Sequence, residues 1–114
     1  SEATRAPVQD LAFLELDLVQ VVGKSEPVRI FTLVGDASLA RSEVFLEAES
    51  TQKHMLEHYR ARRWQEALEL IGQLEQLGLE RFTGYLSMMR QRIEAFRTSP
   101  PGKDWDGVER RLVK

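Results

Sequence analysis

Residues 21–36 read VVGKSEPVRIFTLVGD, two apolar segments separated by a Gly-Lys-Ser-Glu-Pro turn. Residues 28–34 are rich in β-branched and aromatic side chains, and Pro27, which has no N–H to donate, stands just before them, where a strand can begin. Upstream, the strand period of two appears in the alternation of Leu14, Leu16 and Leu18 with Glu15, Asp17 and Val19. The sequence therefore predicts a β-hairpin over residues 11–34, with Gly23 and Lys24 in its turn.

After Gly35 and Asp36 the period changes to that of amphipathic helices. The predicted buried faces are Val44, Ala48, Thr51, Met55 and Tyr59; Trp64, Ala67, Leu68, Ile71 and Leu74; and Phe82, Tyr85, Leu86, Met89, Ile93 and Phe96. Gly78 and the Ser-Pro-Pro-Gly segment at 99–102 end the second and third helices, and short loops predict antiparallel neighbours. We therefore expect an α+β fold, with the hairpin in residues 1–36 and about three helices in residues 37–114.

The tail after Gly102 has little periodicity, so no strand or helix is predicted there. Trp105 and Val108 are its apolar residues most suited to fold back onto the helices. Trp64 followed by Ala67 also resembles a tetratricopeptide-type helix, in which a bulky residue packs over a small one. Since only one such unit is present, packing within the chain's own core is the favoured interpretation, and a peptide-binding groove is the alternative.

The composition excludes several classes of protein. The 114 residues carry a formal net charge of −2, which does not favour a general nucleic-acid or anionic-membrane binder. There is no cysteine, which excludes disulfides, thiolate metal sites and cysteine nucleophiles. No apolar run reaches the roughly 18 residues of a membrane span, and no signal peptide is recognisable. We expect a cytoplasmic protein without a membrane segment.

The predicted hairpin poses a physical difficulty. A two-stranded hairpin is marginal in water, and this one is apolar on both faces. Helices can cover one face, but the second face and the open edges require another partner. Because the chain also begins at Ser1 without an initiator methionine, we expect either a piece of a longer protein or an oligomer that completes the sheet.

The hairpin ELDLVQVVGKSEPVRIFTLVGD (residues 15–36) resembles the closing hairpin of the catalytic domain of class III nucleotide cyclases. SEATR (residues 1–5) is similar to the segment that precedes this hairpin. HMLEHYRARRWQEALELI (54–71), YLSMMRQRIEAF (85–96) and PPGKDWDGVERRLVK (100–114) resemble the extension that follows the domain in many bacterial cyclases. The Pro-Pro…Asp-Trp-Asp-Gly-Val pattern is the most specific of these.

The resemblance implies a homodimeric parent enzyme that converts a nucleoside triphosphate into a 3′,5′-cyclic monophosphate and pyrophosphate. In the family, two aspartates hold Mg²⁺ or Mn²⁺, and an Asn and an Arg position the ribose and stabilise the transition state. All four residues lie upstream of the segment similar to SEATR. Asp10, Asp17 and Asp36 are therefore not assigned as metal ligands, and this chain alone is expected to be inactive. Only Lys24 has a counterpart in the family's site, where it contacts the triphosphate. Whether the substrate is ATP or GTP is not encoded here.

From residue chemistry alone, Lys24 is more simply a solvated turn lysine. A P-loop is excluded, because no Gly lies five residues before Gly23 and a strand rather than a helix follows the Gly-Lys-Ser. His54 and His58 have a spacing that can bind a metal, but no third ligand is evident nearby and a solvated pair is favoured. The alternative function, from a different class, is a non-catalytic helical module for dimerisation or protein interaction.

Overall fold

The computed structural model describes residues 10–111 of the chain. In order, its elements are β1 (Ala12–Val21), β2 (Val28–Gly35), α2 (Ala37–Ala40), α3 (Glu43–Arg60), α4 (Trp64–Gln76), the 3-10 turn η1 (Glu80–Phe82), α5 (Thr83–Thr98) and β3 (Val108–Arg111). The predicted α+β class is confirmed, and the hairpin β1–β2 lies where it is expected. The SEATR segment at residues 1–5 lies outside the described residues.

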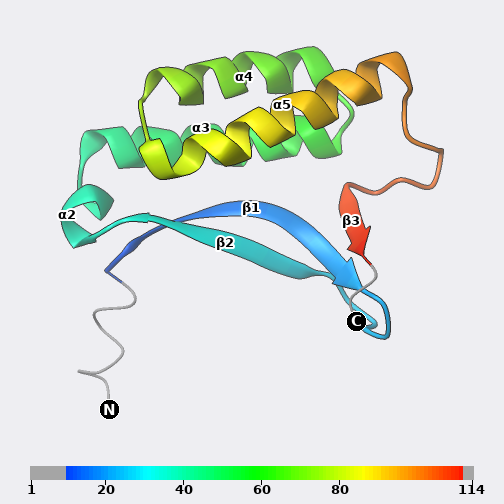
Figure 1. Ribbon diagram of the computed structural model, residues 1–114, viewed down its shortest axis with the longest axis horizontal. Helices are drawn as coiled ribbons and strands as arrows, with labels where there is room; N and C mark the ends of the chain where they lie inside the picture. The colour runs from blue at the N-terminus through cyan, green and yellow to red at the C-terminus, as the bar shows by residue number, and fades with distance from the viewer. Residues whose placement is uncertain (1–9, 112–114) are drawn as a thin grey trace.

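Helices α3, α4 and α5 form a layer on one side of the hairpin (Figure 1). The second and third predicted faces are largely correct, since Ala67, Ile71, Phe82, Met89 and Ile93 are each fully buried. The favoured interpretation of the Trp64–Ala67 pair is also confirmed, because Ala67 is buried in the core and Trp64 packs against it.

The first predicted helical face is wrong at its first position. Ser42 caps α3, with its hydroxyl accepting from the backbone N–H of Phe45 at 3.1 Å. This cap fixes where the helix begins, and Phe45 is buried while Val44 remains 41% exposed. The apolar stripe of α3 therefore starts one residue later than the sequence period suggested.

The sheet has a third strand that the sequence analysis did not predict. The order is β2-β1-β3, with β1 antiparallel to β2 and parallel to β3. Leu18 to Val21 of β1 pair with Val108 to Arg111. The tail is thus a strand along the last part of β1, immediately before the hairpin turn.

A β-bulge shifts the alternation of β1. The register runs from Glu15 opposite Phe31 to Asp17 opposite Ile30, so Leu16 is skipped. As a result Asp17 is only 5% exposed, whereas Leu16 and Leu18 are half-buried, so the predicted period of two is interrupted at Leu16.

The helices stabilise this bulge through hydrogen bonds to β1 carbonyls. Gln52 of α3 donates its amide N–H to the carbonyl oxygen of Glu15 at 2.8 Å. The hydroxyl of Tyr85 of α5 donates to the carbonyl oxygen of Leu16 at 2.7 Å. The two acceptors are therefore satisfied by side chains far away in sequence, as buried backbone groups require.

The tail is held against the helices by an aromatic cluster, which confirms the expectation for Trp105. Its ring centroid lies 5.3 Å from that of Tyr59, 5.6 Å from Trp64 and 5.4 Å from Phe96. The guanidinium of Arg62 lies over the Trp105 ring at 5.4 Å and donates to the carbonyl oxygens of Pro101 and Gly102. Val108 is also buried, but as the first residue of β3.

None of the helices in residues 10–111 combines the length and the hydrophobicity that crossing a bilayer requires.

Candidate anion-binding site at the hairpin tip

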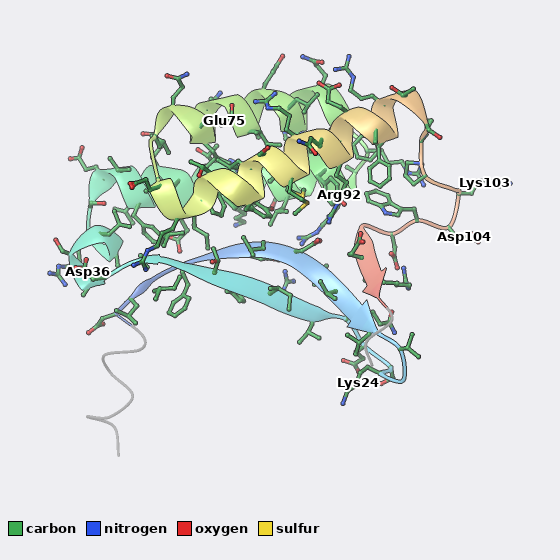
Figure 2. The ribbon with its side chains drawn as sticks, viewed as in Figure 1. Lys24, Asp36, Glu75, Arg92, Lys103 and Asp104 are labelled. Carbon is green, nitrogen blue, oxygen red and sulfur yellow. The ribbon has the colours of Figure 1, made fainter. Side chains whose placement is uncertain are left out.

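Lys24 lies at the exposed tip of the hairpin (Figure 2). Its backbone N–H donates to the carbonyl oxygen of Val21 at 3.2 Å, which closes a tight turn over Val22 and Gly23. Gly23 has a φ of +92°, the conformation that the third position of a type II turn needs and that side chains disfavour. The Gly-Lys pair thus makes a turn that projects the lysine away from the sheet.

Gln20 fixes the far side of this turn. Its side-chain amide donates to the carbonyl oxygen of Lys24 at 3.0 Å. In the sheet register Gln20 lies opposite Arg110 of β3. Gln20 therefore links the backbone of Lys24 to the strand position opposite Arg110.

Lys24 and Arg110 line the same surface hollow, of about 250 Å³, together with Gln20, Val21, Val22 and Gly23. Lys24 forms no ion pair with any residue from 10 to 111. Two like charges repel when they share one hollow, and an anion between them removes that repulsion. The hollow is therefore suited to a small anionic group.

Arg110 is oriented by Asp106. Its two terminal nitrogens donate to the two carboxylate oxygens at 3.0 and 2.9 Å, a bidentate geometry. These bonds, with a further one from the backbone N–H of Val108, lower the pKa of Asp106 to about 2. Because the pair is about half exposed, water screens it strongly; the carboxylate holds the guanidinium in place and offsets part of its charge.

A buried ion pair lies deeper, between the sheet and α5. Arg92 donates to Asp17 Oδ2 at 2.9 Å and to the Tyr59 hydroxyl at 3.2 Å, and Glu109 of β3 lies 3.9 Å from the same nitrogen. Burial raises the pKa of Tyr59, an effect that the hydrogen bond from Arg92 opposes. This network joins β1, α3, α5 and β3.

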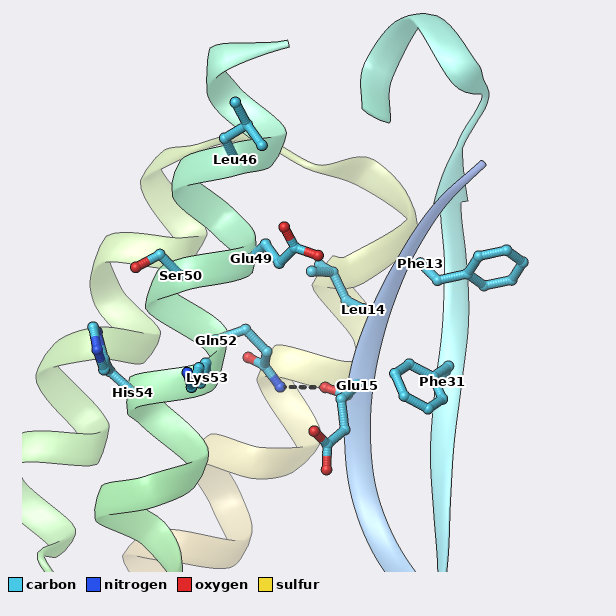
Figure 3. Close-up of a pocket in the computed structure, with 10 residues that line it drawn as sticks. All are labelled: Phe13, Leu14, Glu15, Phe31, Leu46, Glu49, Ser50, Gln52, Lys53 and His54. Carbon is cyan, nitrogen blue, oxygen red and sulfur yellow. Dashed lines mark hydrogen bonds between the residues drawn. The ribbon is translucent and has the colours of Figure 1, made fainter. Parts of the chain in front are cut away.

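A larger cavity of about 480 Å³ opens between α3 and the hairpin (Figure 3). Phe13 and Phe31 line it on the hairpin side, and Gln52, Lys53 and His54 line it on α3. Gln52 is 1% exposed, and its side-chain Oε1 has no hydrogen-bond partner among the described residues. The cavity mixes both signs of charge with aromatic rings and does not define one class of ligand.

The two histidines have different surroundings. His58 accepts a hydrogen bond at Nδ1 from Arg63 at 2.8 Å, and His54 lies on the cavity wall. Within the part of the chain that the structure describes, no three His, Cys, Asp or Glu side chains are grouped to hold a metal ion. Asp17 binds Arg92, and Asp36 caps α2 by accepting from the N–H of Leu39 at 3.0 Å. Residues 10–111 thus do not fit the Mg²⁺ or Mn²⁺ of the cyclase resemblance.

The structure places Arg110 on the same hollow as Lys24, and sequence reasoning missed this second cation. Its signal in the sequence is weak: the short Val-Glu-Arg-Arg segment after Asp106 and Gly107. Comparison of the chain with protein-family models, with curated proteins and with solved structures finds no match.

Proposed function

We propose that this chain is the C-terminal part of a class III nucleotide cyclase and that Lys24 contacts the triphosphate of the substrate. The observation that carries the proposal is the exposed Lys24 at the tip of a Gly-Lys turn, without an ion pair in residues 10–111. The strand, turn and strand that the resemblance implies are present in residues 12–35.

The chemistry gives such a lysine a defined role. In cyclisation the 3′-oxygen forms a bond to the α-phosphorus, the bond to the pyrophosphate oxygen breaks, and the 3′-hydroxyl proton is lost. Negative charge therefore accumulates on the leaving pyrophosphate. A lysine ammonium placed there stabilises that charge more in the transition state than in the ground state. The residues that act at the ribose and remove the proton are upstream of Ser1 in this proposal, and the parent enzyme is a cytoplasmic homodimer.

The test is turnover by the parent cyclase carrying Lys24→Ala, with Arg97→Ala as the control. Arg97 is also an exposed cation, paired with Glu94 on α5 at 3.4 Å. We expect Lys24→Ala to lower kcat about tenfold or more, since each tenfold corresponds to about 1.4 kcal/mol of lost transition-state stabilisation. The 114-residue chain alone should form no cyclic nucleotide. Unchanged turnover in Lys24→Ala, or product from the chain alone, would contradict the proposal.

An exposed apolar strip favours a second candidate, a dimerisation module. Phe31 is 54% exposed, Leu33 38% and Phe13 36%. Phe13 of β1 pairs with Leu33 of β2, and Phe31 lies two residues before Leu33 in β2. The three side chains therefore share one face of the sheet. In the sheet described here β2 is an edge strand, and edge strands with apolar side chains readily pair with another strand.

Light scattering after size exclusion tests this second candidate. A dimerisation module should be a folded dimer at micromolar concentration, and Phe31→Glu should convert it to a monomer because a charge would be buried in the interface. A hairpin taken from a larger sheet should instead aggregate, and Phe31→Glu should then improve its solubility without revealing a defined dimer.

A further inference from the structure

The path of the C-terminal tail brings Arg110 to the hairpin turn. Gly107 makes this path possible: its φ is +83°, and a Cβ there would lie 2.7 Å from Cγ of Arg60. The chain then enters β3, which pairs with the last four residues of β1. The last of these, Val21, lies three residues before Lys24. Residues 108–111 thus lie beside the part of β1 that leads into the hairpin turn.

The two cations differ in ways that suit one anion. Lys24 is a point charge on a flexible stem, whereas Arg110 presents a planar guanidinium whose orientation is set by Asp106. The shared hollow of about 250 Å³ is below the range of about 300–1,000 Å³ that is typical of drug-sized ligands. This volume is enough for a pair of phosphate groups.

We propose that Arg110 is a second phosphate-binding residue and that Lys24 and Arg110 together bind the terminal phosphates of a polyphosphate. This inference rests on the proposed function, since that function supplies the anion. It assigns a binding role to the helical extension, because the segment that contributes Arg110 is anchored by Trp105 on the helices. The expected ligands are pyrophosphate and the β- and γ-phosphates of a nucleoside triphosphate.

The experiment is a titration of the 114-residue chain, carrying Phe31→Glu in every variant so that it stays in solution, with inorganic pyrophosphate, followed by amide chemical shifts at constant ionic strength. Constant ionic strength is needed because screening alone weakens exposed contacts. We expect shifts at Lys24 and at Arg110 with one common dissociation constant. Lys24→Gln and Arg110→Gln should each weaken binding about two- to fivefold, the range for one exposed charge contact. The control Arg97→Gln should leave the constant unchanged.

Asp106→Asn provides a test in the opposite direction. Asn keeps a side-chain oxygen for the N–H of Val108 but removes the charge that competes for Arg110, so binding of pyrophosphate should tighten. A thermal melt of each variant checks that the fold is retained. The same ranking should hold for inorganic tripolyphosphate, because no base or ribose is involved.

The outcomes separate the two proposals. If Lys24→Gln weakens binding and Arg110→Gln does not, the role of Arg110 is overturned while that of Lys24 stands. If pyrophosphate shifts neither residue, the phosphate role of Lys24 falls as well. If Arg97→Gln weakens binding as much as Arg110→Gln, the effect is one of general charge and the shared site is overturned. Loss of binding with Arg110→Gln alone would also overturn the shared site.

Discussion

Arg92 is the residue whose replacement should reveal most about what holds the sheet to the helices. Its side chain is 15% exposed and that of its partner Asp17 is 8% exposed. A buried ion pair costs much desolvation to form, so it is not strong evidence of net stabilisation. Removal of one partner is nevertheless costly, because it leaves the other charge buried without compensation.

We predict that Arg92→Met lowers the free energy of unfolding by about 3–5 kcal/mol. The matched control is Arg90→Met on the same helix: Arg90 pairs with Glu75 at 2.7 Å, but both side chains are more than a third exposed. Such a surface pair contributes about 0–1 kcal/mol. Urea unfolding of both variants measures the difference, and equal losses would show that the Asp17–Arg92 pair does not behave as buried.

A double variant tests the origin of that loss. Asp17→Leu combined with Arg92→Met removes both charges, so it should recover much of the stability lost in Arg92→Met alone. If the double variant is less stable than the single one, the pair contributes net stability through its hydrogen bonds to Tyr59 and to the N–H of Leu18.

At the scale of elements, β3 depends on the conformation of one glycine. We predict that Gly107→Ala destabilises the chain by about 1–3 kcal/mol, because it adds strain at a positive φ and a contact with Arg60. Amide exchange should accelerate in residues 18–21 of β1, where β3 pairs. Gly102→Ala is the control, since a Cβ at Gly102 meets nothing within 4 Å. Equal exchange in the two variants would contradict the structural role of the turn.

The elements that sequence reasoning located correctly are those with local signals. The hairpin follows from the Gly-Lys-Ser-Glu-Pro turn and β-branched strands, and the helical faces follow from a period of 3.6 residues. The inward position of Asp17 was missed because the bulge depends on Gln52 and Tyr85, which are distant in sequence. Strand β3 was missed because Val108 is the only apolar residue in its four positions, and distant contacts of Trp105 bring it to β1.

The candidate site was half predictable for the same reason. Lys24 lies in a turn that its own neighbours specify, so the sequence alone indicated its exposure. Arg110 lines the same hollow only because β3 pairs in parallel with β1. No local sequence pattern predicts this pairing. A binding residue that comes from the far end of a chain is visible only once the path of the tail is known.

At the scale of the whole molecule, both tyrosines of the chain report on the integrity of the fold. The Tyr59 hydroxyl accepts from Arg92, while the Tyr85 hydroxyl donates to Leu16 and accepts from Gln52. Burial raises the pKa of each phenol above its ordinary value of 10.0. The unfolded chain loses both phenolic protons near pH 10, whereas the folded chain retains them to higher pH.

This difference predicts alkaline instability with a defined sign. Above about pH 10 the unfolded state binds fewer protons than the folded state, so the free energy of unfolding falls as pH rises. The contribution is fully present below pH 10 and is lost as pH rises toward the raised pKa values. In an alkaline titration, tyrosinate absorbance should therefore appear together with the loss of far-ultraviolet helical signal, in one transition above pH 10.

Tyr85→Phe gives the control for this titration. It should halve the tyrosinate amplitude while the remaining signal from Tyr59 still coincides with unfolding. The variant should also be about 1–3 kcal/mol less stable at neutral pH, because the carbonyl of Leu16 loses its donor at the bulge. Reversible ionisation of either tyrosine near pH 10 with the helical signal intact would show that its phenol is open to water, and the packing of α3 and α5 against β1 would then be wrong.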